Sequence, residues 1–184
     1  MEPASRTAGA PEARAAGLIV GVGNTLCGDD GAGPVVARRV WELLPERENW
    51  DTLELCRSAL DVIERLAGYR FAVIVDALVD WDAPAGTVVR VSVDESAGDP
   101  SAPSHALGFR DALALARAAG LPLPESIAFY GIVVRGPLVF GAKLSPAIEA
   151  RIETIARQIV EDLARGEKTA GPVCSSNPSS DPGP

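Results

Sequence analysis

Aromatic residues and positive charge are both scarce in this sequence. Phe, Trp and Tyr make up 5% of the 184 residues, too few for a surface on which nucleobases stack. The net charge is −8, whereas a protein that grips nucleic acid needs a basic surface to meet the phosphates. No apolar run approaches the length of a membrane span. We therefore expect neither nucleic-acid binding nor insertion into a membrane.

Cysteine and histidine are also rare. The three cysteines, Cys27, Cys56 and Cys174, are an odd number at wide spacings, so neither a zinc finger nor a disulfide framework is indicated. The N-terminus lacks the basic and apolar regions of a secretory signal. The simplest setting is the reducing cytoplasm. The sequence also contains no Gly-x-Ser-x-Gly, His-Glu-x-x-His or P-loop motif.

The chain is long enough for one domain, and 47% of its residues are hydrophobic, so it can bury a sizeable core. Residues 1–16 have no apolar period and are predicted to be a flexible lead. Residues 167–184 are rich in Gly, Pro and Ser and are predicted to be a disordered tail. A single α/β domain is expected over residues 17–166.

Within that domain, runs typical of strands alternate with runs typical of helices, which predicts a three-layer α/β sandwich. Its central sheet is expected to be mainly parallel, with about five strands flanked by helices. The expected strands are 17–22, 51–56, 71–78, 87–93 and 126–134. The expected helices are 35–44, 59–67, one between Ser104 and Gly120, and one continuous last helix beginning at Ser145-Pro146, with its apolar stripe on Ile148, Ile152, Ile155, Ile159 and Leu163.

A glycine-rich loop with two adjacent acids, Gly21–Gly33, joins the first strand to the first helix. Glycines allow tight turns and close approach to a ligand, and the helix start favours the ionised form of Asp29 and Asp30. The misplaced third glycine and the two acids argue against a dinucleotide loop, because carboxylates would repel a pyrophosphate. The alternative is that these acids merely cap the helix.

A second acid, Asp76, ends the most apolar predicted strand. Ligands of open α/β sheets bind beyond the carboxyl ends of the strands, and Asp30 and Asp76 would both project there. His105, the only histidine, is predicted at a helix start, where the local field favours neutral imidazole. Two carboxylates and an imidazole suit a divalent ion such as zinc, nickel or manganese. The alternative for His105 is an ordinary surface histidine.

These residues resemble the hydrogenase maturation protease family. Its opening motif, Gly-x-Gly-Asn-x-Leu-x-x-Asp-(Asp/Glu)-Gly-x-Gly, is filled by residues 21–33, and its Val-Asp-Ala by residues 75–77. Its Ser-x-His is approximated by residues 103–105. Its Leu-Ser-Pro is matched by residues 144–146. The resemblance covers roughly residues 17–165. It implies a nickel-dependent endopeptidase that removes the C-terminal extension of a [NiFe]-hydrogenase large-subunit precursor after nickel insertion.

The resemblance also implies roles for single residues. Asp30, Asp76 and His105 match the family's metal-binding residues. Either Asp30 or Asp76 would act as general base, or the metal would bind the water. The nickel would arrive with the substrate, and zinc or cadmium could occupy the site in vitro. Gly23, Asn24 and Asp29 belong to the loop that shapes the site, with Asn24 as a carbonyl stabiliser and Asp29 as a carboxylate that directs Asp30.

One segment departs from the family pattern. Many members carry Gly-Gly-Thr after the second strand, whereas this chain has Leu55-Cys56-Arg57-Ser58-Ala59. Arg57 is therefore a candidate contact for an acidic or C-terminal group of a different substrate. Two other functions stay open: a non-catalytic factor that senses nickel and docks on the immature large subunit, and a metal-dependent peptidase of other substrates.

Overall fold

The computed structural model describes residues 15–56, 59–91, 104–141 and 143–165, with the backbone alone at 104–107. Almost all of the predicted lead, the whole of the predicted tail and Arg57 lie outside the described residues. Within those ranges no helix has both the length and the hydropathy that a membrane crossing requires.

The centre of the molecule is a five-stranded sheet in the order β2-β1-β3-β5-β4. β1, β2, β3 and β5 run parallel, and β4 pairs antiparallel with β5 at one edge. The prediction of a mainly parallel sheet is confirmed. The strands are β1 (Gly17–Val22), β2 (Trp50–Leu55), β3 (Phe71–Val79), β4 (Val88–Val91) and β5 (Ser126–Val134).

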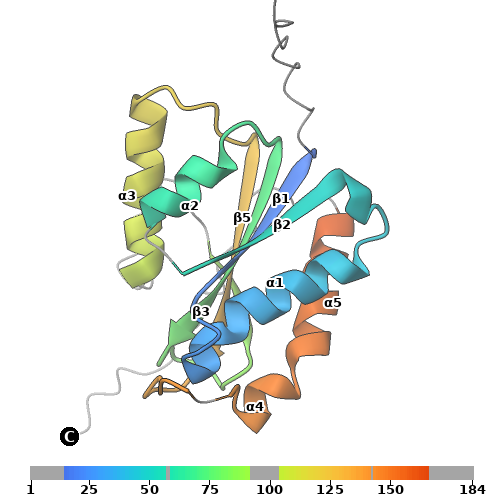
Figure 1. Ribbon diagram of the computed structural model, residues 1–184, viewed down its shortest axis with the longest axis vertical. Helices are drawn as coiled ribbons and strands as arrows, with labels where there is room; N and C mark the ends of the chain where they lie inside the picture. The colour runs from blue at the N-terminus through green and yellow to red at the C-terminus, as the bar shows by residue number, and fades with distance from the viewer. Residues whose placement is uncertain (1–14, 57–58, 92–103, 142, 166–184) are drawn as a thin grey trace, which may run out of the picture.

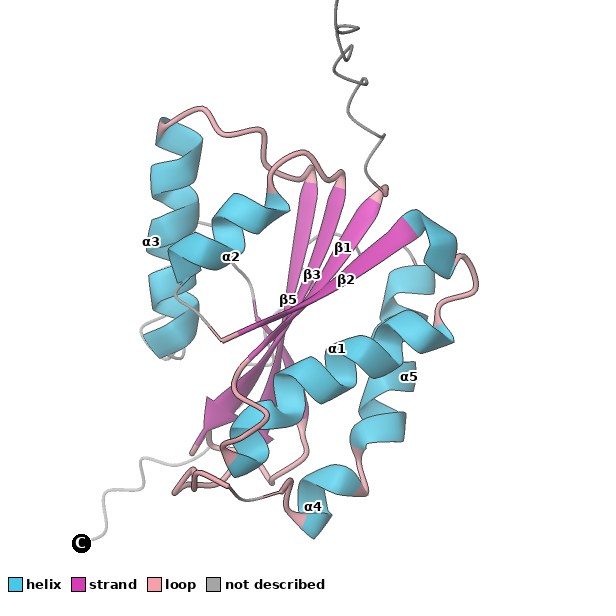
Figure 2. Ribbon diagram, in the orientation of Figure 1, coloured by secondary structure: helices cyan, strands magenta, loops and turns pink. Residues whose placement is uncertain are grey.

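Helices cover both faces of this sheet and make the three layers (Figure 1, Figure 2). Along β1 and β3, successive buried side chains point to opposite faces, so Ile19 and Val73 join one core while Leu18 and Ala72 join the other. The first core packs against α1 (Ala32–Leu43), α4 (Pro146–Glu149) and α5 (Ile152–Ala164), and the second against α2 (Ala59–Leu66) and α3 (Ser104–Ala118). Two short 3-10 helices, η1 (Gly28–Gly31) and η2 (Arg47–Asn49), complete the described elements.

The last predicted helix is wrong as a single element. Ser145 is its N-cap, as expected for Ser before Pro, and its hydroxyl accepts from the backbone N–H of Ile148 at 3.4 Å. The helix then ends at Glu149 and restarts at Ile152. At the break the N–H of Arg151 donates to the carbonyl of Ile148, three residues back, at 2.9 Å, which is a tightened turn. The apolar period of the sequence continues across this break, so the sequence gives no sign of it.

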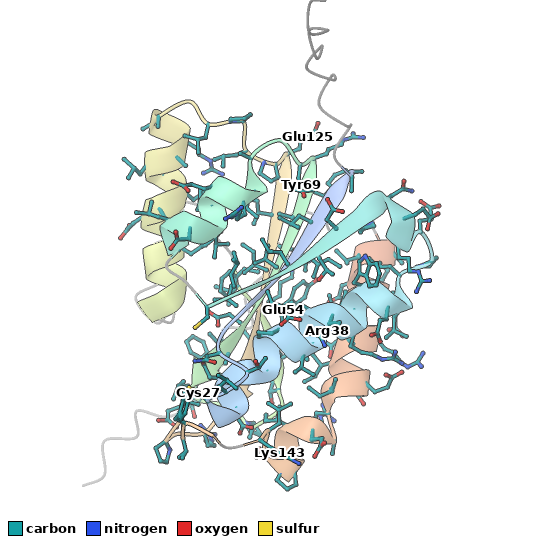
Figure 3. All side chains as sticks on the ribbon, viewed as in Figure 1. Cys27, Arg38, Glu54, Tyr69, Glu125 and Lys143 are labelled. Carbon is teal, nitrogen blue, oxygen red and sulfur yellow. The ribbon has the colours of Figure 1, made fainter. Side chains whose placement is uncertain are left out.

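Ion pairs fix α1 from two sides. Arg38 of α1 pairs with Glu54 of β2 (Figure 3), which raises the pKa of Arg38 through a hydrogen bond and charge attraction. Arg39 donates to Glu153 of α5 at 2.6 Å and to Glu42 of its own helix at 2.8 Å. Because α1 follows the acidic loop directly, these contacts help to fix the start of the helix on which that loop ends.

Candidate active site

The carboxyl edge between β1 and β3 is the place where the chain changes direction. α1, which connects β1 to β2, lies on one face, and α2, which connects β2 to β3, lies on the other. β1 and β3 are neighbours in the sheet, but the chain leaves β1 through α1 on one face towards β2 and reaches β5, on the other side of β3, through α3 on the opposite face. Such a switch point is where open α/β sheets bind their ligands.

The acidic loop closes on itself at this edge. The N–H of Cys27 donates to the carbonyl of Asn24 at 2.9 Å, and the N–H of Asp30 donates to the carbonyl of Cys27 at 3.3 Å. The N–H of Asn24 in turn donates to Oδ2 of Asp30 at 2.8 Å. Gly23 has a φ of +132°, and a Cβ there would overlap the carbonyl oxygen of Asp30, so only glycine allows this closure. The result is a half-buried Asp30 carboxylate held by its own loop.

Gly33 brings the end of this loop against β3. A Cβ at Gly33 would overlap the carbonyl oxygen of Val22 and lie 2.7 Å from that of Val75 and 3.2 Å from Cα of Asp76. No side chain fits in that space. The backbone of the α1 start therefore touches the backbone of Asp76, and η1, which contains Asp30, lies against β3.

Asp76 itself is nearly buried, with 6% of its surface exposed. It lies near the end of its strand, as predicted, because β3 ends three residues later at Val79. The position is an edge, because β1 pairs only as far as Val75, while β5 accompanies β3 beyond it. Oδ1 of Asp76 accepts from the N–H of Ala77 at 2.8 Å. A carboxylate this deep in the fold is costly unless it is hydrogen-bonded or meets a cation.

His105 is the second residue of α3. Ser104, from which that helix was expected to start, is its first residue. The helix leads into β5, and its first turn lies towards the carboxyl edge of the sheet (Figure 1). The imidazole is not among the side chains that the structure describes. Within those described side chains, no three His, Cys, Asp or Glu residues gather closely enough to hold a metal ion.

The loop between β5 and α4 (residues 135–145, described except at 142) contacts the acidic loop in a way that the sequence did not reveal. Asp29 accepts a hydrogen bond at Oδ1 from the N–H of Ser145 at 2.6 Å. The N–H of Gly141 donates to the carbonyl of Leu26 at 2.7 Å. Figure 3 places Cys27 and Lys143 together at this end of the molecule, opposite Tyr69 and Glu125. The acidic loop is therefore flanked by a segment more than a hundred residues later in the chain.

The structure is a three-layer α/β fold in which the acidic loop after β1 lies against β3 near Asp76. The family model for hydrogenase maturation proteases, HycI, matches residues 35–162. The chain belongs to that family, so it is a hydrolase of the hydrogenase maturation endopeptidase class. The matched range begins after the acidic loop, so the membership rests on the remainder of the domain.

Solved structures with the same fold include known members of the family. HybD from Thermococcus kodakarensis is 29% identical, with a TM-score of 0.60 over 80% of this chain and 98% of that one. The hydrogenase maturating endopeptidase HybD from E. coli is 24% identical, with a TM-score of 0.63 over 82% and 93% of the two chains. HycI from T. kodakarensis is 23% identical, with a TM-score of 0.61 over 83% and 95%. No curated protein matches the sequence.

Proposed function

We propose that this enzyme removes the C-terminal extension of a [NiFe]-hydrogenase large-subunit precursor once nickel has been inserted. The observation that supports this most directly is the approach at Gly33, which sets the loop of Asp30 against the backbone of Asp76. Two carboxylates at one edge of the sheet offer oxygen ligands for a divalent ion. His105, on the first turn of α3, would add a nitrogen ligand. The nickel belongs to the substrate and reports that the precursor is loaded.

The chemistry falls to the carboxylates. Hydrolysis of a peptide bond needs a base that takes a proton from water, an acid that returns one to the leaving amine, and a donor for the carbonyl oxygen. Asp30 or Asp76 serves as the base and then gives the proton to the amine. The carbonyl oxygen of the Asn24 side chain accepts from the N–H of Leu26 at 3.0 Å. That contact leaves its NH2 end as the donor group that can turn to the substrate.

The proposed compartment is the cytoplasm. Cys27 and Cys56 are free thiols in the structure, which agrees with a reducing setting.

Arg57 follows β2 and lies outside the described residues. The proposal that Arg57 contacts the substrate's C-terminal or acidic group is therefore supported by the sequence alone.

A processing assay tests the proposed function. The full-length chain is mixed with nickel-loaded and with nickel-free precursor, and the products are weighed by mass spectrometry. Loss of the C-terminal peptide from the loaded form alone supports the proposal. Cleavage of both forms would overturn the proposal that cleavage requires nickel in the precursor. Binding without a change in mass would instead indicate a docking factor. If the chain neither binds nor cleaves the precursor, the proposed substrate is wrong.

A further inference from the structure

The exposed apolar side chains are unevenly distributed over the described surface. Seven large ones are more than a third exposed, and two of these, Leu60 and Leu115, lie on α2 and α3. The other five belong to segments at the carboxyl edge of the sheet. We call these five the apolar rim: Leu26 (59% exposed), Val79 (43%), Leu138 (37%), Val139 (54%) and Phe140 (76%).

Contacts on both sides join the rim into one surface. A Cβ at Gly136 would lie 3.7 Å from Cγ1 of Val79, so the start of the 135–145 loop lies against the end of β3. The far end of the rim is fixed by the hydrogen bond from Gly141 to Leu26. Leu138, Val139 and Phe140 therefore bridge the end of β3 and the acidic loop.

The backbone that carries these side chains is tied down. The N–H of Gly136 donates to Oδ1 of Asp80 at 3.2 Å. The guanidinium of Arg135 donates to the carbonyls of Trp81 and Ala83 at 2.9 and 2.5 Å. An apolar surface that is exposed on a fixed backbone marks an interaction site rather than a loosely packed core.

The rim is continuous with the proposed active site. Leu26 lies inside the two successive turns that carry the chain from Asn24 to Asp30. Two or three residues of extended peptide span about 7–10 Å, so a substrate whose scissile bond lies at Asp30 can place neighbouring side chains on Leu26 and Phe140.

The charge of the molecule selects among partners for this surface. The chain carries a net charge of −8, and Asp29 and Asp30 lie in the same loop as Leu26. A second copy would bring its own acidic loop against this one, which like-charge repulsion disfavours. An apolar peptide without acidic side chains meets no such cost.

We infer that the apolar rim binds apolar side chains of the substrate segment next to the scissile bond and so determines which precursor is cut. The inference rests on the proposed function. It assigns recognition to residues 138–140, the end of β3 and the tip of the acidic loop, while Asp30 and Asp76 perform the chemistry.

Variants of the rim test this inference by separating binding from chemistry. Phe140→Ser and Val139→Ser remove apolar surface from exposed positions, and Leu115→Ser makes the same kind of change at an exposed position on α3. We expect the two rim variants to weaken precursor binding and raise the KM by about tenfold or more. We expect Leu115→Ser to change neither precursor binding nor the KM. In the rim variants the loss should appear in the KM, while kcat at saturating precursor stays near that of the unmodified chain. Circular dichroism and Tm check that all three variants fold.

The outcomes distinguish the two proposals. If the unmodified chain cuts the precursor and the rim variants bind and cut it equally well, the inference is overturned and the proposed function stands. If sedimentation shows a dimer that Phe140→Ser dissociates, the rim is covered by a second copy and the inference is again overturned. If the unmodified chain neither binds nor cuts the precursor, the proposed function fails, and this inference fails with it.

Discussion

The carboxylate of Asp29 and the backbone N–H of Ser145 are 2.6 Å apart although 116 positions separate them in the sequence. Ser145 is also the N-cap of α4, so this hydrogen bond ties the acidic loop to the start of that helix. The neighbouring Asp30 instead accepts from Asn24 within its own loop. The two adjacent acids therefore have different partners: Asp29 connects the loop to the rest of the fold, and Asp30 closes it.

Removing the carboxylate of Asp29 should loosen the 135–145 loop. We expect Asp29→Ala to lower the free energy of unfolding by roughly 1.5–3 kcal/mol, the range for a hydrogen bond to a charged group, and to slow precursor cleavage. Asp29→Asn keeps an oxygen acceptor at the same position, so it should retain most of the stability. Urea unfolding of the two variants measures the difference. Equal stabilities for the alanine and asparagine variants would contradict the role assigned to this contact.

The sequence predicted best where a strand is buried on both faces. The bounds expected for the first strand and for residues 126–134 match β1 and β5, because a continuous apolar run leaves no alternative register for the core. The same logic predicts that Asp30 and Asp76 share one edge, since parallel strands bring their carboxyl ends together, and their role in an acid site stays a prediction.

What the sequence could not predict depends on contacts between distant segments. The Asp29–Ser145 hydrogen bond has no local signal, because any acid before a helix is equally well explained as a cap. The break at Ala150 and Arg151 lies inside an unbroken apolar period, in which Ile148 and Ile155 are both buried. The apolar rim escaped notice because its residues come from the loop after β1, the end of β3 and the loop after β5.

Asp76→Asn should abolish precursor cleavage and leave the fold intact. Asparagine preserves an oxygen that accepts from the N–H of Ala77, but it cannot act as a base or as an anionic ligand. Asp162→Asn is the matched control, because Asp162 of α5 is also buried, at 9% exposure, and pairs with Arg165, the C-cap of that helix. The mass-spectrometric assay should detect product with the control and none with Asp76→Asn. Normal cleavage by Asp76→Asn would remove Asp76 from the site.

Gly33→Ala should separate the acidic loop from β3. The added methyl group overlaps the carbonyl of Val22 and approaches that of Val75, so α1 must shift. Overpacking of this kind costs about 1–3 kcal/mol of stability. We expect the fraction of the Gly33→Ala variant that folds to have lost cleavage of the precursor. Gly108→Ala provides the contrast, because the added Cβ on α3 meets nothing within 4 Å beyond its own helix backbone and chain neighbours, and alanine favours a helix over glycine by about 1 kcal/mol. A Gly33→Ala enzyme with unchanged Tm and activity would refute the close approach.

The contact between α1 and α5 should make stability depend on acid. The hydrogen bond from Arg39 lowers the pKa of Glu153 below its ordinary value of 4.5 in the folded chain. A carboxyl group with a lowered folded pKa contributes stability above its ordinary value and loses that contribution as the pH falls through the folded value. We therefore expect Glu153→Gln to lower the Tm slightly at pH 7 and not at all once the pH is well below 4.5.

Added salt and a control variant separate the contribution of the Arg39–Glu153 pair from the effect of removing any negative charge. The two side chains are 36% and 45% exposed, so added salt should shrink the difference at pH 7. Glu161→Gln removes the same charge from an exposed position on the same helix, and it should not reproduce the pH dependence. A Tm difference for Glu153→Gln that persisted below the folded pKa would show that packing of the side chain, and not the charge on its carboxylate, holds α5 against α1.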